Sequence, residues 1–393
     1  MKTVPGQRVR FGVLALAGLL VAACASAPRS TGPAPMFHDA LFAPPSGPIN
    51  AADLFALSPE MQGYLDTEIA SHQLTKNRQN ALVDALYSSA QLKLEYDATL
   101  TRNAAEAFAA RSGNCLSLVL MTSAFAKRLG LQVQYQFVFS EQSVSRSDGI
   151  VYLSNHVNLT LRPSSTEGRV VTLANEPLTV DFIPATGQGR QRARVVREQS
   201  IIAMYLNNTA AEALRERRFD DAYWWARAAV DQDPAFLAAY NTLGVIYRRR
   251  GHLPEAEQVL RHAVDREPGN TVPMSNLARV LKARGRGDEA AAIEERIRRI
   301  EAVPPFHYFD LGMQAFAEKK YELARENFAR EVERAASYHE FHAWLAAALF
   351  ELGEIDQARK HLQLARDNSS TPADQALYDA RLDALKPRQR TLR

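Results

Sequence analysis

A 34-residue period in the second half of the chain constrains the fold more than any other feature of the sequence. Pro234 and Pro268 lie 34 residues apart, and an acidic residue precedes each of them. Small or apolar residues recur at matching steps before both prolines: Ala222, Ala226 and Ala229 in one unit, Ala256, Leu260 and Ala263 in the next. A fixed period of this length is typical of stacked repeat units. From about residue 200 onward we therefore expect helices and no strands.

Extended along the chain, this pattern resembles the tetratricopeptide repeat (TPR), with units beginning near residues 203, 237, 271, 305 and 339. The third unit departs from it, because Glu294 stands where a large apolar residue is usual. The resemblance implies an all-α TPR solenoid over 199–386, closed by a helix at 373–385 and followed by a basic tail, 387–393. Such arrays bind an extended peptide or a helix, so the implied partner is a peptide or protein. The second unit carries the most consensus positions: Tyr240, Leu243, Gly244, Tyr247, Gly251, Ala256 and Ala263.

The first residues have the composition of a targeting segment. Basic residues precede an apolar run over 11–23, which is shorter than the roughly 20 residues that a spanning helix needs. Val21-Ala22-Ala23-Cys24 resembles a bacterial lipobox, which implies a signal peptide over 1–23, acylation of Cys24 and membrane attachment through lipid. Ala25 after the cysteine implies, by the same resemblance, an outer-membrane lipoprotein that faces the periplasm. An ordinary secretory signal with an incidental cysteine is the alternative.

Between the targeting segment and the repeats, the sequence predicts a tether and one domain. Residues 24–50 are rich in proline and show no sustained periodicity, so we expect a flexible tether. Residues 51–198 show helical patterns first, near 59, 76–92, 101–111 and 115–129, and a short strand at 92–96. Strand patterns then follow at 132–139, 150–161, 169–173 and 178–183. Helices before strands favour an α+β domain.

Cys115 is the candidate nucleophile of this domain. The chain has two cysteines, and acylation of Cys24 would leave Cys115 without a disulfide partner. Cys115 follows Gly113-Asn114 where a helix is expected to begin, and the positive end of a helix dipole stabilises a thiolate. The alternative is that Cys115 is a small buried hydrophobe.

A cysteine nucleophile needs a base and a group that orients the base. His156 lies in an alternating strand pattern, and Asp181 lies in a later one, so a sheet can bring them together. Gly-Asn-Cys at a helix start, then His and Asp on strands, resembles the transglutaminase-like superfamily over about residues 80–185. The resemblance implies a papain/transglutaminase-like fold for 51–198. Within it, Cys115 attacks an amide carbonyl, His156 acts as base and then acid, and Asp181 orients the imidazole.

The same resemblance implies either hydrolysis or acyl transfer through a thioester. The backbone N–H of Cys115 would bind the oxyanion, and the second donor stays open among Gln91, Asn114 and Asn158. The rival hypothesis is a non-catalytic TPR scaffold or assembly factor at the outer membrane, with a degenerate transglutaminase-like domain.

Composition and motifs weigh against several other classes of function. The chain has 47 basic and 44 acidic residues, a formal charge of +3, which does not indicate nucleic-acid binding. We find no phosphate-binding loop or dinucleotide motif and expect no cofactor. His339 and His342 are spaced wrongly for a helical zinc site, so no metal is expected.

Overall fold

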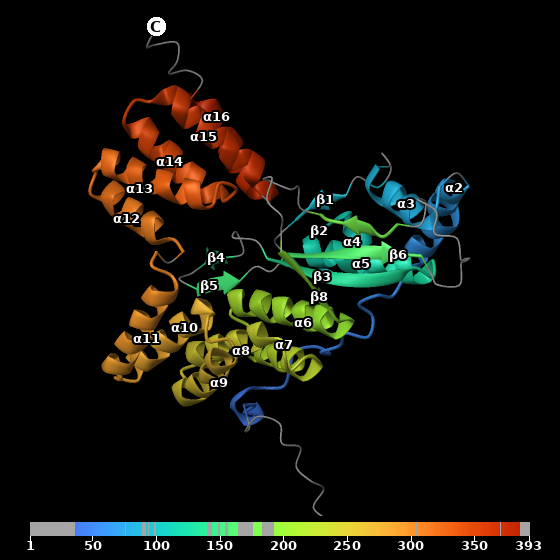
Figure 1. Ribbon diagram of the computed structural model, residues 1–393, viewed down its shortest axis with the longest axis horizontal. Helices are drawn as coiled ribbons and strands as arrows, with labels where there is room; N and C mark the ends of the chain where they lie inside the picture. The colour runs from blue at the N-terminus through green and yellow to red at the C-terminus, as the bar shows by residue number, and fades with distance from the viewer. Residues whose placement is uncertain are drawn as a thin grey trace, which may run out of the picture. The chain divides into compact units, whose positions relative to one another are not determined.

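The computed structural model describes residues 36–74, 76–88, 92, 94–97, 100–139, 144–147, 150–153, 156–163, 176–182, 192–303, 305–369 and 371–385. The predicted signal peptide, Cys24, the strand expected at 169–173 and the basic tail lie outside the described residues. Among the residues that are described, no helix is long and apolar enough to cross a membrane. Figure 1 shows the helices and strands along the chain.

The α+β region begins with short helices whose capping follows the sequence. Helix α1 (Pro59–Tyr64) begins as expected, because the Ser58 side chain accepts the N–H of Met61 and proline takes the first position. Helices α2 (Ala70–Gln73) and α3 (Arg78–Val83) follow, with π-helical turns after α1 and α3. Helix α4 (Ala104–Ala110) starts with a reciprocal capping box between Asn103 and Glu106.

Helix α5 (Cys115–Arg128) is the central helix of this region. Residues 116–126 are all buried, so α5 is enclosed on every side rather than amphipathic. It contacts strands β3 and β6, and its side chains share one core with Met61, Ile69, Val157 and Leu159. The start of α5, where Cys115 lies, is therefore attached to a rigid element.

Four strands of different lengths form an antiparallel sheet in the order β7-β6-β3-β8. The pairing aligns Tyr135 of β3 with Leu159 of β6, and Leu159 with Val180 of β7. The stretch 150–161, expected as one strand, contains two, β5 and β6, and neither β4 nor β8 was expected. The bounds are β1 Glu95–Tyr96, β2 Ser112–Gly113, β3 Gln132–Phe139, β4 Val144–Ser147, β5 Ile150–Leu153, β6 His156–Arg162, β7 Leu178–Val180 and β8 Arg192–Val196.

The second half of the described chain consists of helical pairs, as predicted from the 34-residue period. The second helices of the pairs begin at residues 219, 253, 287, 321 and 355, each 34 residues after the one before. The helices are α6 Glu198–Arg215, α7 Phe219–Gln232, α8 Leu237–Arg249, α9 Leu253–Arg266, α10 Thr271–Ala283, α11 Gly287–Ile300, α12 His307–Ala317, α13 Tyr321–Arg334, α14 His339–Glu351, α15 Ile355–Asn368 and α16 Pro372–Leu385.

Small residues allow the two helices of a pair to approach closely. A methyl group at Gly312 would lie 2.5 Å from the Phe328 ring, and one at Gly244 would lie 2.6 Å from Cγ of Leu260.

The third helical pair, α10 and α11, has the regular length but is loosely packed. Helix α11, described throughout, buries Ala290 alone, while Glu294 points outward to an ion pair with Lys282 at 2.5 Å. The departure at Glu294 therefore weakens packing without changing the repeat length.

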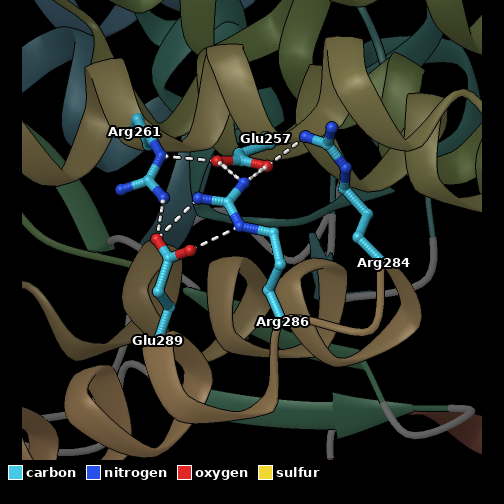
Figure 2. A network of polar contacts seen from close by, with 5 residues as sticks. All are labelled: Glu257, Arg261, Arg284, Arg286 and Glu289. Carbon is cyan, nitrogen blue, oxygen red and sulfur yellow. Dashed lines mark hydrogen bonds and ion pairs between the residues drawn. The ribbon is translucent and has the colours of Figure 1, made fainter.

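A buried carboxylate joins the second and third helical pairs (Figure 2). Glu257 of α9 accepts hydrogen bonds from Arg261 and Arg286 at 2.7 Å each, and it also pairs with Arg284. Arg284 and Arg286 belong to the turn between α10 and α11, so the carboxylate ties that turn to α9. Glu289 pairs with two of the same guanidinium groups from the outer side.

The second half of the expected tether packs on the helical array instead of remaining flexible. The Phe42 ring stacks on Tyr223 of α7 with 3.9 Å between ring centroids. The backbone N–H and the hydroxyl of Ser46 donate to Asp221 at 2.7 and 2.8 Å. Aromatic stacking and charge-assisted hydrogen bonds stabilise this segment, and a count of prolines does not reveal either. Residues 37–47 therefore form an arm bound to the array.

Candidate functional site

Cys115 is the first residue of helix α5, as the sequence predicts, and it is a partly buried free thiol. The Asn114 side chain caps the helix and accepts the backbone N–H of Ser117 at 2.9 Å. Gly113 is required just before the cap, because a Cβ there would lie 2.6 Å from Cβ of Ser117. The first amides of a helix have no partner within the helix. Their N–H groups and the positive end of the dipole favour an anion at this position.

Strand β1 lies beside the turn that precedes Cys115. Tyr96 pairs with Gly113 in parallel register, and the Asp97 N–H donates to the Gly113 carbonyl at 3.1 Å. The pKa of the Tyr96 phenol is raised, first by burial and then by the charge of Cys115, whereas a hydrogen bond with the Cys115 backbone lowers it. The residue as a whole is 37% exposed. Sequence reasoning did not assign Tyr96 a place in the site.

His156 and Asp181 meet at the start of strand β6. His156 Nε2 lies 2.6 Å from Asp181 Oδ1, and His156 is only 8% exposed. The second carboxylate oxygen of Asp181 accepts a hydrogen bond from Asn158 Nδ2 at 2.9 Å. His156 and Asn158 alternate along β6 with Val157 and Leu159, which belong to the core. The strand therefore presents the imidazole and the amide together to one carboxylate.

The protonation of His156 reflects both Asp181 and Cys115. Burial would lower the pKa of this histidine, but the hydrogen bond to Asp181 and the proximity and charge of Cys115, together with the charge of Asp181, raise it to about 9. Nε2 lies against Asp181, and Nδ1 is buried without a hydrogen-bond partner among the described residues.

The three predicted site residues lie in the same part of the fold, but only two of them are in direct contact. His156 and Asp181 form a direct pair, and Cys115 influences the pKa of His156. Asn158, one of the candidates for the second oxyanion donor, instead has its amide N–H bonded to Asp181. Asn114 caps α5, and Gln91 lies outside the described residues. Among the residues that the structure describes, no three potential metal ligands gather in one place.

The array is similar to known repeat proteins. A family model of the tetratricopeptide repeat matches residues 250–308. The matched stretch contains helices α9, α10 and α11 and the Glu257 network. Repeats of this type suggest protein–protein interaction. No match was found among the curated proteins.

Three solved structures with some likeness to the chain share little sequence identity with it. PilF of Pseudomonas aeruginosa is 19% identical, with 50% of this chain and 89% of that chain covered and a TM-score of 0.30. A thermophilic TPR protein of Thermus thermophilus is 15% identical, with 47% and 98% covered and a TM-score of 0.30. YrrB, described as a TPR protein with an unusual peptide-binding site, is 19% identical, with 46% and 92% covered and a TM-score of 0.25.

Proposed function

We propose that the chain is a transglutaminase-like cysteine enzyme that acts on an amide bond of a peptide or protein. The observation that carries this proposal is the His156–Asp181 pair at 2.6 Å, on an imidazole whose pKa depends on Cys115. A thiol at a helix start, an imidazole and an orienting carboxylate supply the parts that nucleophilic catalysis requires. The sequence order of the three residues is that of the transglutaminase-like superfamily.

In the proposed reaction the Cys115 thiolate attacks the amide carbonyl carbon, and a C–S bond forms. The carbonyl oxygen takes up negative charge near the first N–H groups of α5. When the C–N bond breaks, protonated His156 gives its proton to the leaving nitrogen, and a thioester remains on Cys115. Neutral His156 then takes a proton from water or from an incoming amine. Attack by that group releases the acyl chain as an acid or as a new amide, and Cys115 regains its thiolate.

The array supports binding of a protein substrate or partner. A cavity of about 580 Å³ lies among helices α14, α15 and α16. Trp344, Phe350 and Leu377 give it apolar walls, and Glu340 and Asp374 add acidic groups. A concave apolar surface with a few polar groups is typical of a binding site. The same cavity favours the rival function, a scaffold that needs no thiol.

Reactivity of the thiol separates the two functions. The proposed enzyme should react with iodoacetamide at Cys115 faster at pH 7 than the same cysteine does in the urea-unfolded chain. Mass spectrometry of the peptide that contains Cys115 measures this rate without interference from Cys24. A scaffold with an inert thiol should react more slowly when folded, because burial limits access. Slower reaction in the folded chain would contradict the proposed enzymatic function.

We also propose that Cys24 anchors the chain to the outer membrane, on its periplasmic face. The support is the lipobox-like sequence Val21-Ala22-Ala23-Cys24. Cys24→Ser should move the protein from the membrane fraction to the soluble fraction, since acyl chains would be its means of attachment. Ala25→Asp is the matched control: it should keep the protein membrane-bound but shift it to the inner membrane on a density gradient. Unchanged fractionation of Cys24→Ser would contradict the anchor.

A further inference from the structure

The cap of the nucleophile's helix is held from outside the helix as well as from within it. Asn114 Oδ1 accepts the backbone N–H and the hydroxyl of Ser117, both at 2.9 Å. Its Nδ2 donates to Thr101 Oγ1, also at 2.9 Å. The adjacent Arg102 N–H donates to the Ser117 hydroxyl at 2.8 Å. Both ends of the Asn114 amide are therefore fixed, and Cys115 is the next residue.

Thr101 is in turn held by helix α6, the first helix of the repeat array. Asn208 Nδ2 donates to Thr101 Oγ1 at 3.2 Å, and the Thr101 N–H donates to Glu212 Oε1 at 2.8 Å. Thr101 is 8% exposed. Burial raises the pKa of Glu212, and hydrogen bonds from the side chain and backbone of Thr101 partly offset that rise. These bonds favour the carboxylate form, which accepts stronger hydrogen bonds than a neutral group does.

We propose that helix α6 of the array positions the nucleophile, because Asn208 and Glu212 hold Thr101 and Thr101 holds the cap Asn114. This rests on the function proposed for Cys115. Asn208, Glu212 and Thr101 are positioning residues, since they touch neither the thiol nor the imidazole in the described contacts. The array then has two separate tasks, to bind a protein and to complete the support of the active-site helix.

The direction of the effect follows from what each bond fixes. Thr101→Val keeps the shape of the side chain but leaves the amide groups of Asn114 and Asn208 without their acceptor. A looser cap lets the first turn of α5 fray, and fraying removes the oriented N–H groups that favour the thiolate. The end of a helix favours a charge there by a factor of roughly two to thirty. We therefore expect Cys115 reactivity near neutral pH to fall by roughly two- to thirtyfold.

The test measures iodoacetamide alkylation at Cys115 in the full chain over pH 5–9. Thr101→Val and Asn208→Ala should both react more slowly near neutral pH, with the rise in rate displaced to higher pH. Thr101→Ser keeps the hydroxyl and should restore the wild-type profile. Asn207→Ala is the matched control, since Asn207 is the neighbouring asparagine on α6 and its Oδ1 has no hydrogen-bond partner among the described residues. It should leave the profile unchanged.

The outcomes separate this inference from the proposed function. Suppose that wild-type Cys115 is highly reactive and that Asn208→Ala and Thr101→Val have the same pH dependence of the alkylation rate. Then α6 does not position the nucleophile, and the proposed enzymatic function is unaffected. If wild-type Cys115 reacts no faster than it does in the unfolded chain, the proposed function is wrong. The positioning role of α6, which depends on that function, is then wrong as well. If Thr101→Val does not fold by circular dichroism, Asn208→Ala decides, because alanine favours a helix.

Discussion

Cys115→Ala is expected to abolish covalent chemistry on peptide substrates while leaving the fold intact. Removal of the nucleophile of a catalytic group lowers turnover by about a thousandfold or more. The thiol is only partly buried, so its loss should change the free energy of unfolding by less than about 1 kcal/mol. In a host that depends on this protein, the variant should fail to replace the wild type although it accumulates to the same level.

The matched control keeps the thiol and alters the array. Trp344→Ala changes the wall of the α14–α16 cavity, and Leu377 and Phe350 still line it. This variant should retain iodoacetamide labelling at Cys115 and lose only partner binding. If Cys115→Ala supports full function in the host while Trp344→Ala does not, the chain is a scaffold and the catalytic account is wrong.

Glu257→Ala is expected to destabilise the array by about 2–3 kcal/mol. Removal of one partner from a buried ion pair costs about 3–5 kcal/mol. Here the three arginine side chains are between 32% and 41% exposed, so solvent screens part of the loss. The control is Glu289→Ala, because Glu289 pairs with two of these arginines, Arg261 and Arg286, but is half exposed. Its loss should cost clearly less than the loss of Glu257, since solvent screens an exposed ion pair. Urea unfolding followed by circular dichroism measures both, and equal losses would contradict the ranking.

The contribution of Glu257 to the free energy of unfolding should decrease as the pH falls. Burial raises the pKa of this carboxyl, but hydrogen bonds from Arg261 and Arg286 outweigh burial and lower it. A lowered pKa in the folded state gives stability that is fully present above the unfolded pKa of about 4.3. That stability is lost as pH falls through the lower folded value. The difference between wild type and Glu257→Ala should therefore be constant near neutral pH and shrink in acid.

Local patterns predicted the helices well because their signals lie within a few residues. Ser58 and Pro59 marked the start of α1, and Gly113-Asn114 marked the start of α5. The 34-residue period predicted the spacing of the helical pairs because each pair repeats the same packing requirement. The small residue at Gly312 belongs to that requirement, since the Phe328 ring occupies the space beside it.

Contacts between distant segments were harder to predict. Residues of the arm and of strand β8 carry no repeated pattern, and Val195 of β8 is 58% exposed. The sequence predicted that Asp181 and His156 meet, because both lie in strand patterns. The hydrogen bond from Asn158 to Asp181 depends on the register of β6 against β7, which the sequence does not reveal. The bond between Thr101 and Asn208 joins residues 107 apart, and neither residue type nor spacing indicates it.

The central claim, a thiolate on Cys115 stabilised by His156, is tested most directly by the alkylation rate of Cys115 at pH 6.5 in wild type and in His156→Ala. His156 keeps its proton at this pH, because its pKa is raised to about 9, and the imidazolium stabilises the thiolate. His156→Ala lacks this cation and should therefore react more slowly than the wild type. Equal rates in the two proteins would show that His156 does not activate Cys115.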